Sequence, residues 1–448
     1  MLATQGKERY LSAFKSYQEN GAGRGPAWLK ELRESAIASF GKLGFPTVRD
    51  ENWKYTNIDP IVSTTFEPSG RNAKNSRAVG ANEIFALSFT DPAANRLVFI
   101  NGAYSPELSS LRGLPRGARV ESLADALGSG DVVLRDHLSR YVRYREHSFA
   151  ALNTAFVEDG ALVIVPKREV IEEPIYLVFV SLGEDRPVVS HPRNLILVGE
   201  GSHARIVESH LGIGRVAYLA NAVTELVGGE AAAIEHYLLQ RDADAGFHIG
   251  MLEAHLSRQC TFVGHCITLG GSLVRNNAHV VLDGEGAECG LNGLYLLDGK
   301  QHVDNHTEIE HCMPRAKSLE LYRGILRGKA RAVFDGKILV HKDAQKSDAR
   351  QTNKNLLLSE DAVINTKPQL EIYADDVKCS HGSTVGQLDR DALFYLRSRG
   401  IDFEAAQSLL SYAFASDVIG GVKIASLRDQ LNEYLLTKFR SAPYASHP

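Results

Sequence analysis

The tripeptide Cys379-Ser380-His381 is the segment of this sequence whose residue types most clearly offer chemistry. In an extended strand, residues i and i+2 project from the same face, so the Cys379 thiol and the His381 imidazole would lie side by side. Such a pair suits the binding of iron or zinc, the acceptance of sulfur, or nucleophilic attack by a cysteine that histidine activates. Because a C-x-H pair is also common as an incidental structural feature, the motif alone leaves these roles open.

A second group of polar residues alternates along the segment from His302 to Cys312. On a strand, the alternate members would share one face and offer nitrogen and oxygen ligands to a divalent ion. These members are His302, Asp304, His306, Glu308 and Glu310. A solvated polar strand face or a turn within a β-helix rung is the commoner arrangement for such a pattern, and the sequence assigns no role to Cys312.

Several common catalytic signatures are absent from the sequence. It contains no G-x-x-x-x-G-K-[ST] phosphate-binding loop and neither the G-x-S-x-G nor the H-E-x-x-H hydrolase motif. Its five cysteines are scattered and include no C-x-x-C pair, which indicates a reducing compartment and argues against a disulfide framework or a permanent metal centre. We therefore expect a protein that is not an enzyme and has no permanently bound cofactor.

Composition narrows the classes of partner. A net charge of -4 over 448 residues gives no general attraction to nucleic acid or to anionic lipid. The first residues carry charges throughout and lack the apolar core of a signal peptide, and the longest apolar runs, such as 161–165 and 175–182, are far shorter than a membrane span. We expect a cytoplasmic protein without nucleic-acid or membrane partners.

The elements that would position these residues change character along the chain. The segment PAWLKELRESAIASFGKLG, which starts at Pro26, places apolar residues four apart and predicts a helix, and helical patches follow at 122–127 and 132–144. The polar segment 69–80 predicts a loop. From about residue 161, short apolar or alternating runs separated by turn residues predict a succession of strands.

A weak repeat distinguishes among the possible β architectures. A turn followed by alanine and alternating apolar residues recurs at irregular intervals along the β region. The alanines of this repeat are Ala204, Ala232, Ala287, Ala330 and Ala362. Irregular spacing favours a right-handed parallel β-helix with loop insertions over a propeller, whose blades have nearly constant length. An ordinary β-sandwich remains the alternative on pattern alone.

Sequence patterns typical of helices return near the end of the chain. The segment 391–399 ends before Gly400, Asp402 is placed to cap the next helix, and a last helix carries Leu427, Leu431 and Leu435. The predicted fold is therefore mainly β, with α-helical regions at both ends of the β-helix. The expected divisions are an N-terminal helical or mixed region at 1–155, a β-helix core at 156–388 and a C-terminal helical domain at 389–448.

Several motifs of the chain resemble those of the SufB/SufD family, and specifically its SufD branch. They are ENWKYTNIDP at 51–60, FAALNTAFVEDGALVIVP at 149–166, RAVFDGKILV at 331–340, and the long stretch 351–401 that contains DDVKCSHGSTVG. SufB-like chains carry a different sequence before FY-x-x-x-RGI, without the cysteine and histidine of the C-S-H motif.

The resemblance implies a scaffold subunit of the SUF machine, whose β-helix pairs side by side with SufB and whose C-terminal helices dock on the ABC-type ATPase SufC. In that pair, nascent iron-sulfur clusters form at the interface, where a SufB cysteine meets a SufD histidine. His381 has the position of that histidine, with Cys379 beside it, and would hold iron or a cluster only transiently. The candidates for SufC contact are Phe394, Tyr395, Arg397, Arg399 and Phe414.

Our mechanistic hypothesis is that ATP binding and dimerisation of SufC pull on both C-terminal arms, shift the β-helix interface and expose His381 to iron or sulfide. Three alternatives stay open at this point. The chain is a SufB-like primary cluster scaffold, an enzyme on a β-helix that uses Cys379 and His381 and needs a thiolate of lowered pKa, or a structural member in which Cys379 is buried and inert.

Overall fold

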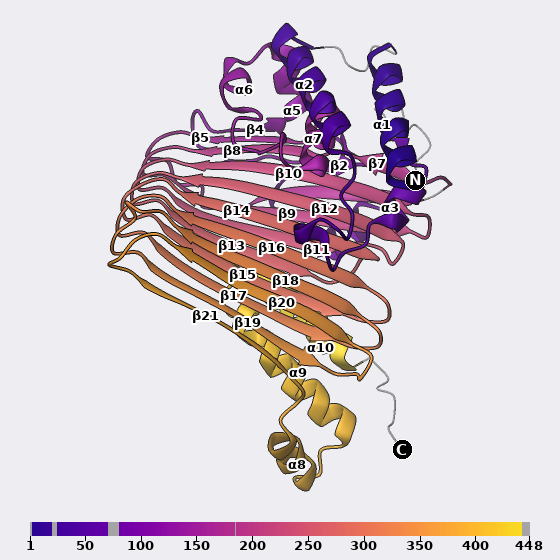
Figure 1. Ribbon diagram of the computed structural model, residues 1–448, viewed down its shortest axis with the longest axis vertical. Coiled ribbons are helices and arrows are strands. Elements are labelled where there is room, and N and C mark those ends of the chain that lie inside the picture. Colours follow the sequence, from indigo (N-terminus) through magenta and orange to yellow (C-terminus); the bar gives the residue numbers. More distant parts are fainter. Residues whose placement is uncertain (1, 20–24, 70–79, 184, 441–448) are drawn as a thin grey trace.

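The computed structural model describes residues 2–19, 25–69, 80–183 and 185–440, and its centre is a parallel β-helix with helices at both ends (Figure 1). Consecutive strands alternate between two parallel sheets, so each turn contributes one strand to each sheet. Sheet A contains β5 (Ala161–Val165), β8 (Arg193–Val198), β10 (Tyr218–Gly228), β12 (Gly246–Leu256), β14 (Leu273–Leu282), β16 (His302–His311), β18 (Arg331–Val340) and β20 (Val363–Ile372). Sheet B contains β6 (Ile175–Gly183), β9 (His203–Gly214), β11 (Ala233–Arg241), β13 (Thr261–Thr268), β15 (Glu288–Leu297), β17 (Lys317–Leu326), β19 (Asp348–Leu357) and β21 (Lys378–Gly386). The predicted mainly β class and the parallel β-helix are confirmed, and the sandwich is excluded.

The turns of the solenoid are more regular than the alanine spacing suggested. Each pairing step, as from β17 to β19, spans about 30 residues. Ala232 and Ala287 directly precede strands of sheet B, whereas Ala330 and Ala362 directly precede strands of sheet A. The irregular intervals therefore come from mixing two different corners of the solenoid. The inferred loop insertions were wrong, although the fold that they favoured was right.

The interior of the solenoid is built from columns of equivalent residues. Ile234 lies beside Phe262 and Phe262 beside Cys289 in successive strands of sheet B, and all three are buried. Because successive strands pair in a constant register, alternate residues of every strand point inward and stack in this way. Burying one large apolar side chain contributes about 1.5–3 kcal/mol, so the stacked columns supply the main stabilisation of the body.

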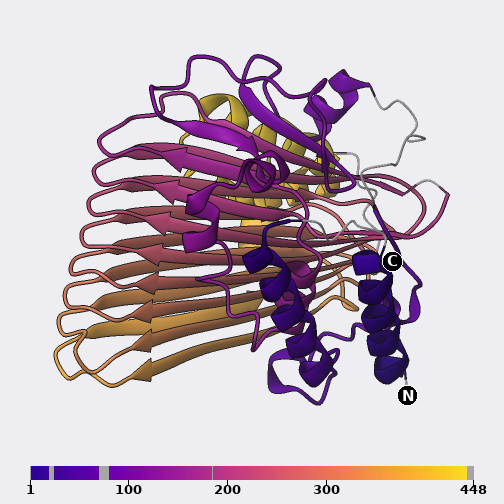
Figure 2. The same ribbon diagram turned by 90° about the horizontal axis from the view of Figure 1, so that it is seen from above.

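The N-terminal region covers one end and one side of the solenoid (Figures 1 and 2). Its elements are α1 (Leu2–Glu19), α2 (Ala27–Leu43), η1 (Glu51–Trp53), α3 (Asp59–Ser63), β1 (Glu67–Pro68), α4 (Ala81–Leu87), β2 (Asn95–Ile100), β3 (Ala103–Tyr104), β4 (Arg119–Ser122), α5 (Leu123–Ser129), α6 (Val132–His137) and α7 (Ser148–Ala155), with the short strand β7 (Val188–Ser190) following β6. β2 continues sheet B beyond β6, and β4 continues sheet A beyond β5. Strands β2 and β4 therefore cover the strand edges at the first turn of the solenoid.

The helix predicted from Pro26 is confirmed as α2, which starts directly after Pro26 and ends at Leu43, followed by the C-cap Gly44 with a positive φ of 67°. The patch predicted over 132–144 is helical only to His137. The segment that follows is instead held by the buried Glu225 carboxylate, which accepts hydrogen bonds from the amides of Ser139, Tyr141 and Val142. The loop predicted at 69–80 lies, apart from its two end residues, outside the described residues.

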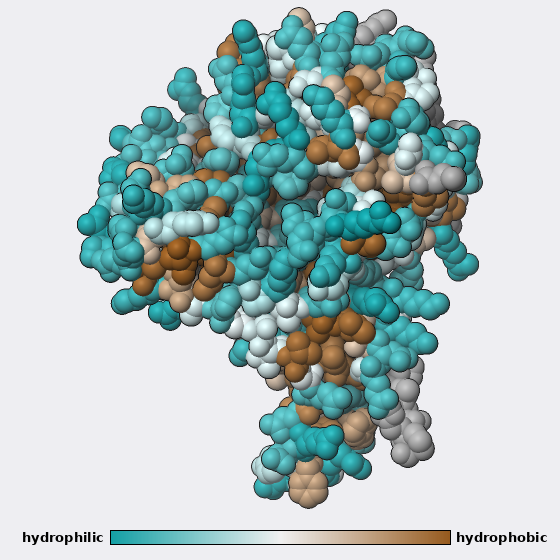
Figure 3. Space-filling view, viewed as in Figure 1, coloured by the Kyte–Doolittle hydropathy of each residue, from teal (hydrophilic) through white to brown (hydrophobic). Residues whose placement is uncertain are grey.

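The C-terminal helices are α8 (Arg390–Ser398), α9 (Phe403–Ile419) and α10 (Ala425–Arg440). The Asp402 side chain accepts a hydrogen bond from the Ala405 amide and caps α9, as predicted. Helices α9 and α10 pack on the outer face of sheet B, where Val418 and Leu427 join the same apolar cluster as Ile267. Helix α8 projects away from the body (Figure 1). The face shown in Figure 3 is mostly hydrophilic, but hydrophobic residues gather on it where the last turns meet these helices.

Candidate functional site

The solenoid ends at β20 and β21, each of which is hydrogen-bonded to another strand on one side only. Among the residues that the structure describes, no strand pairs with their outer edges, which we call the open edges. Four large apolar side chains around this end are between 37% and 63% exposed: Val363, Ile372, Tyr373 and Val385. An uncovered strand edge flanked by apolar side chains is a template for pairing with another chain.

Hydrogen bonds show which backbone groups of β20 face its open edge. The amides of Val363 and Tyr373 donate to the carbonyls of Ala330 and Val340, on the β18 side. Odd-numbered positions of β20 therefore bond within the chain, and even-numbered positions face outward. Pro368, which has no amide hydrogen, occupies one of the even positions and so costs no hydrogen bond in sheet A.

In β21 the pattern of odd and even positions is reversed, so the odd-numbered residues turn their backbone groups to the open edge. The amide of Lys378 donates to the Ser347 carbonyl at 2.9 Å, so even-numbered positions bond to the β19 side. Cys379 and His381 consequently turn their backbone N–H and C=O groups toward the open edge. These two residues are thus placed for main-chain contact with any strand that extends sheet B.

The side chains of Cys379 and His381 share one face of β21, as predicted. In the pairing with β19, Cys379 lies beside Ala349 and His381 beside Gln351, and both of these partners are buried inside the solenoid. The Cys379 and His381 side chains therefore point toward the axis of the solenoid at its open end. Cys379 is half-buried in an apolar cluster that includes Val340, whereas His381 is exposed.

The environment of Cys379 does not activate its thiol. Burial raises the pKa of this thiol, and the charge of Asp348 adds to the effect. The thiol therefore carries its proton at neutral pH. A cysteine nucleophile needs a lowered pKa and a nearby base, so this environment does not favour covalent catalysis by Cys379.

Two buried residues continue the His381 column into the solenoid. Gln351 lies beside Glu320 in the next strand pair, and its Nε2 donates to Glu320 Oε2 at 2.6 Å. Burial raises the pKa of Glu320 to about 7, although hydrogen bonds from Thr307 and Gln351 oppose the shift. A partly protonated carboxyl group therefore lies two turns below the open end at neutral pH.

Replacing Glu320 by glutamine is expected to stabilise the protein above pH about 7. In the wild-type protein, the folded chain binds the Glu320 proton more tightly than the unfolded chain does. The stability that this proton contributes is complete below the unfolded pKa near 4.5 and is lost as the pH rises through about 7, whereas glutamine has no proton to lose. The shift corresponds to roughly 3 kcal/mol. Urea unfolding of both proteins at pH about 3.5 and about 8.5 should show a gap in free energy only at the higher pH; an equal gap at both would contradict the assignment.

Four of the five predicted SufC-contact residues lie together on or next to α8. Phe394 is 74% exposed and Tyr395 57% exposed. The Arg399 guanidinium lies 5.2 Å from the Tyr395 ring centroid, and that of Arg397 lies 5.9 Å from the ring of Phe403. The projecting helix thus presents aromatic rings with guanidinium groups beside them, a composition typical of protein-binding surfaces.

Phe414 lies apart from this group, on α9. It is half-buried against sheet B, and the Arg323 guanidinium lies 4.8 Å from its ring centroid. Arg323 also donates to the Phe414 carbonyl at 2.7 Å and forms an ion pair with Asp417. The structure therefore places Phe414 in the packing of α9 onto the solenoid.

The polar segment at 302–306 contacts the motif at 51–60 instead of solvent. Thr56 Oγ1 donates to Asp304 Oδ2 at 2.5 Å and lies 2.9 Å from His302 Nε2. Arg275 Nη1 donates to the same Asp304 oxygen at 2.5 Å, while its guanidinium lies 3.8 Å from the Trp53 ring centroid. Burial would raise the pKa of Asp304, but Arg275 and the neighbouring histidine hold it well below its usual range. These residues anchor the N-terminal segment to sheet A. At 302–304 the segment is therefore neither the solvated strand face nor the set of free metal ligands that the sequence suggested.

Asp304→Ala is expected to destabilise the protein by about 3–5 kcal/mol, because it leaves the buried Arg275 guanidinium without its counter-ion. The free energy of unfolding in urea measures this loss. Glu288→Ala provides the control, because its ion pair with Lys317 is exposed and is worth at most about 1 kcal/mol. Equal losses in the two variants would show that Asp304 is not an anchor.

All five cysteines are free, in agreement with the predicted absence of a disulfide framework. Cys260 and Cys289 are buried inside the solenoid, where desolvation raises the pKa of the Cys260 thiol to about 12. Cys266, Cys312 and Cys379 are half-buried. No described helix has the length and apolar character that crossing a membrane requires.

Comparison with known proteins places the chain in one family. The model of the SufBD protein N-terminal region matches residues 4–177, and the model of the SufBD core domain of the SUF system for FeS cluster assembly matches residues 179–414. The chain is 34% identical over 434 residues to an iron-sulfur cluster assembly SufBD family protein of Synechocystis, a match that covers 95% of this chain and 94% of the relative.

Two proteins with the name SufD are also similar to this chain. The SufD protein of Escherichia coli is 30% identical over 417 residues, which cover 93% of both chains. That of Bacillus subtilis is 24% identical over 434 residues, which cover 95% of this chain and 96% of the relative. As its motifs predicted, the chain belongs to the SufBD family of the SUF system for iron-sulfur cluster assembly.

Proposed function

We propose that this chain is a non-catalytic scaffold subunit of a SUF complex, which pairs with a SufB-like subunit through the open edges and offers His381 to a nascent cluster at that interface. The observation that carries the proposal is the position of His381. Its imidazole is exposed at the open end of the solenoid, and its backbone lies on a strand edge with which no described strand pairs.

Strand addition at the open edges explains the pairing. A second β-helix that ends in the same way would extend both sheets at once, because β20 and β21 terminate one sheet each. The exposed apolar side chains of Val363, Ile372 and Val385 would be buried by such a partner. Pro368 lacks a donor and restricts which strand fits beside β20, which favours one specific partner over edge-to-edge aggregation.

The ligands at the open end suit transient cluster chemistry. Neutral imidazole binds borderline iron(II) as a nitrogen donor. His381 and the protonated Cys379 are too few to hold a cluster alone, since stable iron-sulfur centres take about four protein ligands. A cysteine from the SufB-like subunit would complete the ligand set, and iron or the cluster is cargo of the complex that is passed on within a reducing cytoplasm.

The projecting α8 supplies the link to ATP. Its exposed Phe394 and Tyr395 would dock on a SufC-like ABC ATPase, while α9 and α10 fix the arm to sheet B. A change in the distance between two docked ATPase subunits would then be transmitted to the paired solenoids as a rigid-body shift. The energy for rearrangement at His381 comes from nucleotide binding by the partner.

Co-expression of the full chain with SufB-like and SufC-like subunits tests the proposal. We expect a complex of all three, from which Phe394→Asp loses the ATPase but keeps the SufB-like subunit. Val132→Asp is the matched control, because Val132 is 67% exposed on α6 at the opposite end of the molecule. Failure of the wild-type chain to bind either subunit, or equal behaviour of the two variants, would refute the arrangement.

The alternatives gain less support from the geometry. A SufB-like primary scaffold needs several accessible thiolates, whereas Cys260 and Cys289 are sealed in the interior. An enzyme that uses Cys379 needs a lowered thiol pKa, whereas burial raises it.

A further inference from the structure

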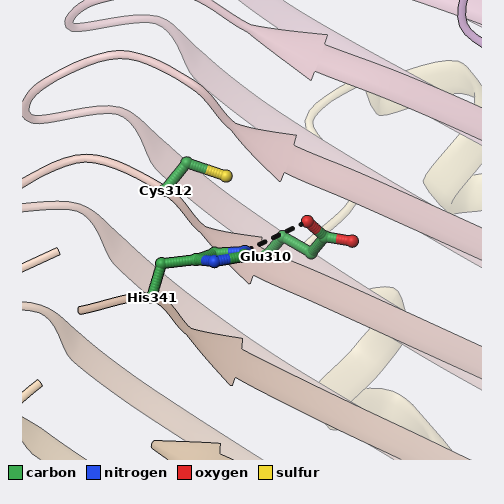
Figure 4. A group of neighbouring side chains, drawn as sticks. All are labelled: Glu310, Cys312 and His341. Carbon is green, nitrogen blue, oxygen red and sulfur yellow. Dashed lines mark hydrogen bonds and ion pairs between the residues drawn. The ribbon is translucent and has the colours of Figure 1, made fainter. Parts of the chain in front are cut away.

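Three side chains with different ligand atoms converge on the outside of the solenoid at one corner. They are Glu310, at the end of β16, Cys312, two residues later, and His341, directly after β18 (Figure 4). One ligand atom from each lies within 4.8 Å of the other two. Glu310 Oε2 and His341 Nε2 are already 3.3 Å apart. No step of the proposed function uses these residues.

The repeat of the solenoid brings the three residues together. His311 pairs with Val340 in the register of β16 and β18, so the next residues, Cys312 and His341, occupy equivalent positions in adjacent turns. The His341 amide donates to the His311 carbonyl at 3.0 Å, which fixes this stacking. The side chains remain open to solvent, since His341 is 45% exposed and Glu310 20% exposed. The cluster therefore combines a rigid backbone with access for an ion.

A buried histidine orients the Glu310 carboxylate from behind. His279 Nε2 lies 2.9 Å from Glu310 Oε1, and its Nδ1 lies 2.6 Å from Glu253 Oε2. Both ring nitrogens of His279 are therefore engaged by carboxylate oxygens. His279 occupies Oε1 and leaves Oε2, the oxygen that faces His341, for a cation.

We propose that Glu310, Cys312 and His341 bind a divalent transition metal ion of the zinc and iron(II) class. Oxygen, sulfur and imidazole nitrogen together match the preference of these ions and disfavour calcium and magnesium, which take oxygen ligands. In a tetrahedral site with bonds of about 2.1 Å, oxygen and nitrogen ligands lie about 3.4 Å apart, close to the observed separation of Glu310 and His341. Binding replaces the hydrogen bond between these two side chains and releases the thiol proton of Cys312.

The proposed metal site and the His381 site lie on opposite sides of the solenoid wall. Val340, directly before His341, packs inside the corner in the same apolar cluster as Cys379. His341 lies outside that corner, and the amide of Tyr373 in the next turn donates to the Val340 carbonyl at 2.9 Å. The two sites share no residue, so the metal proposal stands or falls independently of the function proposed above.

Titration of the EDTA-treated, desalted full-length protein with Co²⁺ under anaerobic conditions tests the site. We expect one equivalent of Co²⁺ to produce the near-ultraviolet charge-transfer absorption of a thiolate ligand, and Zn²⁺ to displace it. Cys312→Ser should lose this absorption, and His341→Ala should bind Co²⁺ at least tenfold more weakly, as expected for loss of one ligand. Cys266→Ser is the matched control and should behave as wild type, because Cys266 is another half-buried cysteine and belongs to neither site.

Each contrary result is decisive, because His341 is too exposed for its replacement to unfold the chain, and circular dichroism verifies the fold of every variant. The proposal is overturned if the wild-type protein shows no thiolate absorption, if the absorption survives in Cys312→Ser, or if His341→Ala binds Co²⁺ as tightly as wild type. Loss of the absorption in Cys379→Ser would place the ion at the open end instead.

Discussion

His381→Ala is expected to reduce cluster formation on the assembled complex at least tenfold while leaving assembly of the complex intact. The side chain is exposed and points toward the axis at the open end, so its removal costs this chain little stability. It removes a nitrogen ligand that no other described residue at this end replaces. Anaerobic loading with iron and sulfide, followed by visible absorption and metal analysis, measures the loss.

His203→Ala is the matched control, because His203 is another partly exposed histidine of sheet B, at the start of β9 and far from β21 along the solenoid. Its complex should load as wild type. Normal loading by the His381→Ala complex would show that the imidazole is not a ligand. Dissociation of that complex would instead assign His381 a role in subunit packing.

Ser383→Pro is expected to weaken binding of the SufB-like subunit more than tenfold without unfolding this chain. Ser383 has the same parity as His381, so its amide faces the open edge and makes no hydrogen bond to β19. Proline removes that donor and places its ring where the added strand must lie. β20 already carries Pro368 at an outward-facing position, which shows that this end of the solenoid accommodates the ring.

The neighbouring residue gives the control for this experiment. The amide of Thr384 has the parity of Lys378 and bonds toward β19, so Thr384→Pro should lower the unfolding midpoint of the isolated chain. Ser383→Pro should not change that midpoint. Wild-type affinity of Ser383→Pro for the SufB-like subunit would show that β21 is not the pairing strand.

Local pattern predicted several elements of this fold. The alternation around Cys379 and His381 predicted their shared strand face, and the apolar spacing after Pro26 predicted α2. The alanine repeat led to the correct fold through an incorrect reason, because one sequence motif serves both corners and only the register separates them.

The features that the sequence did not predict depend on contacts between residues far apart in the chain. The helix predicted at 132–144 ends early because the Glu225 carboxylate, from sheet A, accepts hydrogen bonds from the backbone amides that would continue it. The Asp304 segment is polar because Asp304 accepts hydrogen bonds from Thr56 and Arg275, and no local sequence pattern reveals these contacts. A single signal, the repeat of about 30 residues, would have placed His341 beside Cys312, and it becomes visible only once the register of the turns is known.

Amide hydrogen exchange at the open edges tests the central claim most directly. In the isolated chain, the outward-facing amides, which are the odd positions of β21 and the even positions of β20 other than Pro368, should exchange rapidly. Addition of the SufB-like subunit should slow them at least tenfold and leave the outer face of sheet B unchanged. Unchanged exchange at both edges, with protection appearing on the N-terminal helices or on the other strands of sheet B, would contradict the account.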